Sequence, residues 1–515
     1  MISNRVFFKN LLANWTGLSA NLVVMFFLSP FILHSIGITE YGIWQLLIVL
    51  TGYMGIMDLG IRASTGRYII LYLAKNDINK VDETIRTGLG IYSVLSGFIL
   101  GAGFLLGIFF PEIFEGIPKA YHRLIAVLFP IFAVNLWISA LRTVLSSLLA
   151  AYERFDLSNG SELVVLFLRT IITIIVLKMG LSLIGLTIAV IASNIAGLVV
   201  NIILCRKIHE NLRIWPLLLK KERVKELYNY GIGAFMLAVS AKVIGQTDLV
   251  IAGAFIDVNS VAVYSVGAML IYYSDSFTKK INGTLFPSLQ KAVTTKDLEE
   301  VKFIMYRQTR LYLSVGILLY VGYFSFCQDF IKLWMYDPKT FSMESVYKAS
   351  VVMQILAFAK LILLPGSFSR SILSATDKIK FAANMIIVEA FINLGLSLVF
   401  VLVFGLGLKG IALGTLVSNL TIQVFVLPFH AFKKVKISWI EFLLKMGSRG
   451  FLSAVIFFGI CFFVQKLFII QSWSGFFVQV GFSVLLYIPL VFIFLLHEKD
   501  KKTILQMLRK KFLAI

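Results

Sequence analysis

The sequence predicts an all-α integral membrane protein with fourteen transmembrane helices, built as two parallel six-helix repeats followed by two C-terminal helices. Composition, recurring apolar windows and internal similarity predict this class. The 515 residues are 59% hydrophobic and 15% charged, with a mean hydropathy of +0.88. Soluble domains are about 45–50% apolar and about 25% charged. Apolar windows of about 20 residues, the length that crosses a bilayer, recur from end to end.

The apolar windows define fourteen predicted spans. The first follows a short polar N-terminus without a small-residue cleavage site, so we expect a retained helix and not a cleaved signal peptide. The eighth is short, and its apolar character extends toward residue 286. The spans are 11–34, 41–66, 87–109, 124–149, 157–177, 184–204, 229–252, 263–278, 311–327, 349–369, 383–403, 411–431, 451–465 and 477–497.

The distribution of basic residues predicts the orientation. With the N-terminus in the cytoplasm, 35 of the 48 Lys and Arg residues fall in inner segments, 8 in outer segments and 5 inside spans. Because cytoplasmic loops carry the excess of Lys and Arg, both termini are expected in the cytoplasm. The same asymmetry accounts for most of the net charge of +21. Anionic lipid explains that charge, so no nucleic-acid partner is expected.

Several function classes are disfavoured by what the sequence lacks. The three cysteines are far apart, which predicts neither a disulfide framework nor a metal site. The sequence contains no Walker loop, no metal-spaced histidine cluster and no nucleophile elbow. We therefore expect no catalytic residues, no cofactor and no ATP bound to this chain.

Internal similarity predicts the repeat. G-L-S-L-I-G at 180–185 recurs as G-L-G-L-K-G at 405–410, and each is followed at the same distance by Ser-Asn. L-A-A-Y-E-R at 149–154 corresponds to L-S-A-T-D-K at 373–378. An even number of spans in each half makes the repeats parallel. The predicted organisation is an N-lobe at 1–208, a cytoplasmic linker at 209–228, a C-lobe at 229–435, and helices 13 and 14 with a basic tail at 436–515.

This architecture resembles a known family. Two six-helix repeats plus two helices, with G-x-x-x-Y-G-x-W at 37–44 and D-L-G at 58–60, are similar to the oligosaccharide-lipid flippases of the polysaccharide-biosynthesis (Wzx or O-antigen transporter) type. These belong to the multidrug/oligosaccharidyl-lipid/polysaccharide (MOP) exporter superfamily. The resemblance implies MATE-like lobes and alternating access. It also implies transfer of an undecaprenyl-diphosphate-linked oligosaccharide from the inner to the outer leaflet of the bacterial cytoplasmic membrane. Expected partners are membrane lipids and a polysaccharide polymerase or export machinery, and a proton or sodium gradient is the expected driving force.

Ionisable residues inside spans are the candidate site residues, because charges at bilayer depth usually mark a pathway. Basic residues suit the diphosphate of the implied substrate. The candidates for diphosphate binding are Lys242, Arg62, Arg142, Arg169 and Lys360. The candidates for a gate or for ion coupling are Asp58, Asp248, Asp275, Lys279 and Glu389.

Two acid–base pairs and three aromatic side chains are further candidates. Asp58 and Arg62, like Asp275 and Lys279, are four residues apart and are expected to share a helix face. Each pair is either a structural pair at the inner helix end or a gate. Arg62 and Arg142 could also reach the inner interface, whereas Arg169 and Lys360 could pair with local acids. Candidates for stacking on sugars are Trp15, Tyr272 and Tyr273.

Two alternatives remain open at this level. A cation-coupled MATE-type multidrug exporter needs an acidic cleft, and the spans contain one more base than acids. A polytopic glycan polymerase or transferase usually has a large outer loop with catalytic polar residues. The longest outer segment here, about 328–348, contains only Asp329, Asp337 and Glu344 as acids.

Overall fold

The computed structural model describes residues 4–55, 60–210, 212–215, 217–468, 472–496 and 501. Within these ranges, the side chains of 4–16, 18, 232–245 and 276–285 are not described. The described residues form seventeen α-helices and no strand, apart from a single β-bridge between Asp337 and Phe341. The chain divides into two compact units, Met1–Ala262 and Val263–Ile515. The protein is therefore all-helical, as predicted.

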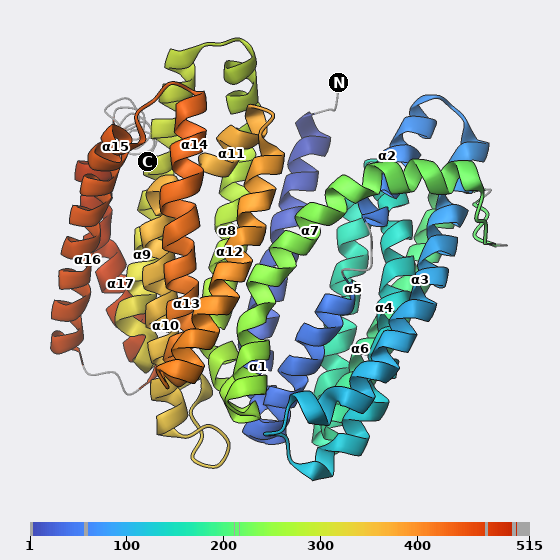
Figure 1. Ribbon diagram of the computed structural model, residues 1–515, viewed down its shortest axis with the longest axis horizontal. Helices are drawn as coiled ribbons and strands as arrows, with labels where there is room; N and C mark the ends of the chain where they lie inside the picture. Colours follow the sequence, from blue (N-terminus) through green and yellow to red (C-terminus); the bar gives the residue numbers. More distant parts are fainter. Residues whose placement is uncertain are drawn as a thin grey trace, which may run out of the picture. The chain divides into compact units, whose positions relative to one another are not determined.

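The first unit is a bundle of long helices (Figure 1). Its helices are α1 (Asn4–Met54), α2 (Ile61–Ala74), α3 (Ile78–Ile113), α4 (His122–Ala151, preceded by the 3-10 turn Lys119–Tyr121), α5 (Phe155–Lys178), α6 (Ser182–Ile208) and α7 (Lys221–Phe255). Helix α8 (Val258–Thr294) begins in this unit and continues into the second. It reaches past residue 286, as its apolar character predicted.

The second unit contains α8 to α17 (Figure 1). Several of its helices continue through π-helical turns, at Val399–Val403, Leu420–Val426, Leu443–Gly447 and Val491–Leu495. The remaining helices are α9 (Leu298–Met335), α10 (Met343–Leu363), α11 (Ser369–Ala375), α12 (Ile379–Leu398), α13 (Gly407–Asn419), α14 (Leu427–Lys434), α15 (Trp439–Phe442), α16 (Ser448–Leu467) and α17 (Trp473–Leu490).

Among the described residues, eleven helices are long and apolar enough to cross a membrane. The protein is therefore a multi-pass membrane protein, while the number fourteen stays a prediction. The first two predicted spans are joined in α1, which kinks at Gly37 (φ 80°, ψ 168°). The predicted span 41–66 is not one continuous helix, since α1 ends at Met54 and a new helix begins at Ile61 after the left-handed Gly60 (φ 73°).

Local backbone conformations recur at positions matched by the sequence repeat. Gly180 (φ 75°) and Gly405 (φ 63°), 225 residues apart, are both left-handed at the start of a tight turn between two helices. Glu153 (φ 57°) and Asp377 (φ 56°), 224 residues apart, also share this conformation. These non-glycine residues are uncommon at positive φ. Their recurrence agrees with the predicted repeat, whose lobe boundaries stay a prediction.

Helix α7 packs within the first unit, against α1, α2 and α3. Gly60 allows the close approach of α7, since a Cβ there would lie 2.0 Å from the carbonyl oxygen of Gly231. Gly42 of α1 does the same for the start of α8, since a Cβ there would lie 2.0 Å from the carbonyl oxygen of Val258. The predicted linker 209–228 is partly helical, because α7 already begins at Lys221.

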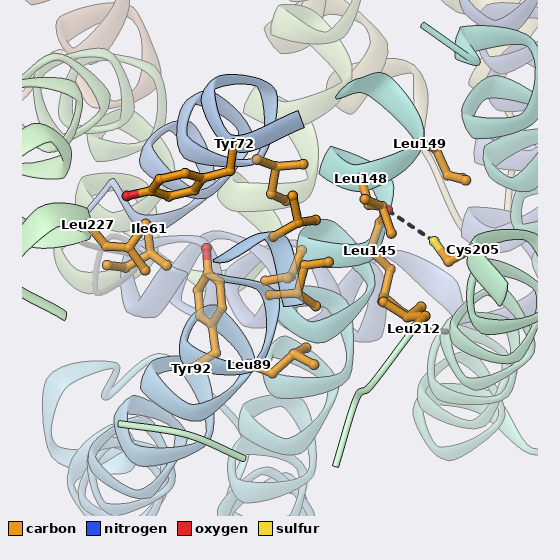
Figure 2. Packing of buried hydrophobic residues seen from close by; sticks show 14 residues of the cluster. Ile61, Tyr72, Leu89, Tyr92, Leu145, Leu148, Leu149, Cys205, Leu212 and Leu227 are labelled. Atoms are coloured by element: carbon orange, nitrogen blue, oxygen red, sulfur yellow. Dashed lines mark hydrogen bonds between the residues drawn. The ribbon is translucent and has the colours of Figure 1, made fainter. Parts of the chain in front are cut away.

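The core of the first unit contains a cluster of buried aliphatic and aromatic residues from α2, α3, α4, α6 and α7 (Figure 2). The cluster includes Ile61 and Tyr72 of α2 together with Leu145 and Leu148 of α4. The Cys205 thiol donates a hydrogen bond to the Leu145 carbonyl oxygen at 3.3 Å. Burial of these side chains fixes the α2–α3 hairpin on the bundle.

Candidate functional site

The second unit contains a polar pocket of about 300 Å³ around Asp275, Lys360 and Arg370. Asp275 of α8 accepts an ion-paired hydrogen bond from Lys360 Nζ of α10 at 2.6 Å, and a longer hydrogen bond from the Tyr320 hydroxyl of α9 at 3.3 Å. Three consecutive helices therefore contribute side chains to one polar cluster. With two bases against one acid in the lining, the pocket favours an anionic group.

Arg370 reaches this pocket because the chain breaks before it. Pro365 ends α10 in a 3-10 turn (Leu364–Gly366), and α11 begins at Ser369. Proline cannot donate the backbone hydrogen bond of a continuing helix. The predicted span 349–369 is thus interrupted, and Arg370, assigned from sequence to a cytoplasmic segment, lines the pocket with Lys360.

Glu389 lies behind the same pocket. It is almost completely buried on α12 and accepts a hydrogen bond of 2.5 Å from the Gln423 amide nitrogen, and Gln423 itself lines the pocket. Arg370 and Lys360 are near enough to act on the Glu389 carboxyl group electrostatically. The structure therefore groups three sequence candidates, Asp275, Lys360 and Glu389, with two residues that the sequence analysis missed.

An apolar groove of about 840 Å³ lies next to the polar pocket. It is formed by α9, α10, α16 and the π-helical turn before α16, with side chains such as Leu313, Phe358, Leu444 and Phe451. Tyr320 lines both the groove and the polar pocket. An apolar groove beside a basic pocket fits a molecule with an apolar tail and an anionic head.

In the first unit, Arg142 is the centre of a second polar cluster. The buried Arg142 of α4 donates to the Asn194 side-chain oxygen of α6 at 2.7 Å and forms a short ion pair with Glu162 of α5. Asn194 in turn donates to Asn135 at 2.8 Å. A Cβ at Gly197 would lie 3.0 Å from the Arg142 side chain, so the small residue makes room for it. These contacts place Arg142 inside the bundle and not at an interface.

Other predicted candidates lie apart from these clusters. Asp248 is buried on α7, and the neighbouring Thr247 hydroxyl lies 3.0 Å from the Tyr53 hydroxyl of α1. Arg62 is exposed in the first turn of α2, and Arg169 is half-buried on α5. Tyr272 and Tyr273 are half-buried on α8.

For four of the candidates, the structure does not describe the side chain. Asp58 lies outside the described residues, and the side chains of Trp15, Lys242 and Lys279 are not described. The predicted partner of Asp275 was Lys279, whereas the structure pairs Asp275 with Lys360. No group of three or more His, Cys, Asp or Glu side chains in the described part of the chain is arranged to hold a metal ion.

The fold defines the class of protein. A MATE-family multidrug transporter in its inward-facing conformation superposes with a TM-score of 0.68 at 13% identity, covering 80% of this chain and 94% of that one. The lipid II flippase MurJ in an inward closed conformation gives 0.65 at 17% identity, covering 95% and 98%. A MOP superfamily transporter from Pyrococcus furiosus gives 0.61 at 12% identity, covering 84% and 97%. The chain thus has the fold of the MOP superfamily transporters.

The family follows from the sequence itself. The model of the lipid II flippase MurJ family matches residues 73–489, and the chain belongs to that family. No curated protein sequence matches significantly. The chain is therefore a transporter and not an enzyme, and it handles a lipid-linked substrate in the membrane.

Proposed function

We propose that the protein transfers an undecaprenyl-diphosphate-linked oligosaccharide between the leaflets of the bacterial cytoplasmic membrane for surface polysaccharide synthesis. One observation carries the proposal: the apolar groove and the basic pocket of the second unit are neighbours, with Tyr320 lining both. The groove would take part of the prenyl chain, and Lys360 and Arg370 would bind the diphosphate. A cationic drug would meet two bases against the single acid Asp275 in the same lining, which disfavours a multidrug exporter.

Lipid II is the second candidate cargo, because the family that matches the chain is named for it. Both candidates are lipid-linked, so the groove and pocket serve either one. They differ in the group beyond the diphosphate. Tyr272, Tyr273 and Trp15 remain proposals for contacts with that group.

The transport cycle that we propose is alternating access between two six-helix halves. The recurring left-handed residues at 153 and 377, and at 180 and 405, support the repeat on which it rests. The driving force would be a proton or sodium gradient, with Asp275 and Glu389 as coupling or gate residues. Lys242, Arg62, Arg142 and Arg169 are proposed as further contacts of the anionic substrate in other stages of the cycle.

The experiment is a flipping assay in proteoliposomes with a fluorescent undecaprenyl-diphosphate-linked oligosaccharide or fluorescent lipid II. Arg370→Gln removes a charge-assisted hydrogen bond to phosphate, so we expect flipping to slow by about tenfold to a hundredfold. Val455→Trp would fill the groove and slow flipping of both cargoes. The matched control is Val478→Trp on α17, because Val455 and Val478 are 50% and 58% exposed but only Val455 lines the groove.

The outcomes separate the hypotheses. Faster flipping of the oligosaccharide than of lipid II supports surface polysaccharide synthesis, and the reverse favours lipid II. Equal rates for Val455→Trp and Val478→Trp, together with an unaffected Arg370→Gln variant, would refute the proposed binding site.

A further inference from the structure

An exposed surface of aromatic and basic residues lies in the first unit, on the segment before α7 and on the first turns of α7. We name it the α7 entry surface and define it by Arg213, Trp215, Lys221, Lys225 and Tyr228. All five side chains are exposed, Trp215 by 76% and Tyr228 by 50%. In the described part of the chain, no ion pair is formed by Arg213, Lys221 or Lys225.

The helix itself explains why one face is free. Lys221, Lys225 and Tyr228 follow one another at helical spacing and share a face. The opposite face is packed: Leu227 is buried in the core cluster of Figure 2, and Arg223 is buried against Tyr72 and Glu226. The orientation of the exposed face is therefore fixed by burial of the other.

Ion pairs and hydrogen bonds hold this segment on the α2–α3 hairpin. Lys220 Nζ lies 2.8 Å from a Glu83 carboxylate oxygen, and the Arg223 guanidinium lies 3.5 Å from the other one. The Tyr72 hydroxyl donates to Glu226 at 3.0 Å. The Leu218 backbone N–H donates to the Arg86 carbonyl oxygen at 3.3 Å. The α7 entry surface is thus a fixed part of the first unit and not a free linker.

Its place in the fold is the end of the bundle. Figure 1 shows that the first turns of α7 run across the ends of the long helices of the first unit before α7 turns to run along them. Helices α3, α4, α5 and α6 are long and apolar enough to cross the bilayer. A helix that lies across their ends is at the depth of the lipid headgroups.

The charge of the region complements an anionic headgroup. Among the exposed residues from 206 to 228, six are basic and two are acidic. The basic residues are Arg206, Lys207, Arg213, Lys220, Lys221 and Lys225. Tryptophan and tyrosine favour the interface because one end of each ring is apolar and the other is polar.

We propose that the α7 entry surface binds the headgroups of anionic phospholipids in the leaflet that it faces. Arg213, Lys221 and Lys225 contact the phosphate groups, while Trp215 and Tyr228 insert at the level of the glycerol backbone. This is a binding site for bulk membrane lipid, distinct from the pocket and groove of the second unit. It ties the segment that leads into α7 to the lipid composition of the membrane.

The test uses the full chain in phosphatidylcholine vesicles with a minor fraction of brominated phosphatidylglycerol or brominated phosphatidylcholine. The Trp215 signal is the difference in fluorescence between the wild type and Trp215→Phe. We expect stronger quenching by brominated phosphatidylglycerol at equal lipid fraction, and a decline of this preference at high salt. Each basic residue near the surface contributes about fivefold to the local enrichment of anionic lipid.

The variant Arg213→Gln/Lys221→Gln/Lys225→Gln should lose the preference. The charge-matched control is Lys178→Gln/Lys339→Gln/Lys409→Gln, three exposed lysines at other helix connections, and it should keep the preference. Equal quenching of wild-type Trp215 by the two brominated lipids would overturn the proposal, even if the triple variant fails to fold. An unchanged preference in the triple variant, or an equal loss in the control, would overturn it too.

Discussion

The ion pair between Asp275 and Lys360 allows a quantitative test of the site. Lys360 Nζ lies 2.6 Å from Asp275 Oδ2, and each side chain is 23% exposed. Lys360→Met keeps most of the apolar stem and removes the ammonium group. The Asp275 carboxylate then loses its cationic partner in a pocket that is mostly shielded from water.

The expected loss in the free energy of unfolding lies between two limits. Removing one partner of a fully buried pair costs about 3–5 kcal/mol, whereas an exposed pair contributes about 0–1 kcal/mol. Because about a quarter of each side chain is exposed, we expect about 2 kcal/mol for Lys360→Met. In a unit of this size that lowers the melting temperature by roughly 4–8 °C.

The assay is a double-mutant cycle on the detergent-purified protein, with thermal unfolding of Lys360→Met, Asp275→Asn and the double variant. The double variant should be less destabilised than the sum of the single variants, by about 1–2 kcal/mol. The matched control cycle is Lys348→Met with Glu344→Gln. That pair has a similar distance of 2.7 Å, but its side chains are 53% and 74% exposed. Its coupling should be below about 0.5 kcal/mol.

Two results would refute this reasoning. If the Asp275 and Lys360 substitutions are additive, the two groups do not stabilise each other. If the exposed control pair shows the same coupling, burial does not strengthen the interaction in the pocket.

Three further predictions concern the first unit. Gly60→Ala should lower the free energy of unfolding by more than about 1 kcal/mol in thermal unfolding, because Gly60 has a positive φ and a Cβ there would lie 2.0 Å from the Gly231 carbonyl oxygen. Gly97→Ala is the control and should be tolerated, since a Cβ there has nothing within 4 Å. Equal effects of the two substitutions would contradict the close approach at Gly60. Arg142→Leu should lower the free energy of unfolding by about 1 kcal/mol, because Arg142 is 10% exposed but its partner Glu162 is 53% exposed and partly solvated. Adding Glu162→Gln should restore part of the loss, and no restoration would argue against the pair. Asp77→Ala should lower the melting temperature at neutral pH, because Asp77 caps α3, and the hydrogen bond and charge of Lys80 lower the pKa of its carboxyl group below the ordinary 3.8. A carboxyl group with a lowered pKa in the folded protein stabilises the fold above pH 3.8. The difference in melting temperature between Asp77→Ala and the wild type should therefore disappear as the pH falls below that value. A difference that does not depend on pH would contradict this role of Asp77.

The site was partly predictable from the sequence. Charges at bilayer depth identified Asp275, Lys360, Glu389 and Arg142, because such residues are costly unless they are paired inside a bundle. The sequence could not supply their partners. Lys279, four residues from Asp275, is the nearest partner along a helix, but Lys360 comes from another helix 85 residues away.

Other partners were missed for identifiable reasons. Glu162 lies near the inner edge of the predicted span 157–177 and is not among the sequence candidates, yet it pairs with Arg142. Arg370 was assigned to a cytoplasmic segment, yet it lines the pocket because the helix breaks at Pro365. The proline was a usable signal for a break, but the direction that the chain takes afterwards depends on the packing of α11 against α12 and α14.

The sequence by itself determined that the protein is helical and crosses the membrane several times. This follows from composition, because backbone groups in hydrocarbon must be satisfied within each segment and apolar windows of about 20 residues form helices. Only the tertiary structure decided where α1 kinks, that α7 packs in the first unit, and which charges share a pocket. These features depend on contacts between helices far apart in the chain, and the hydropathy of one segment carries no information about the side chains of its neighbours.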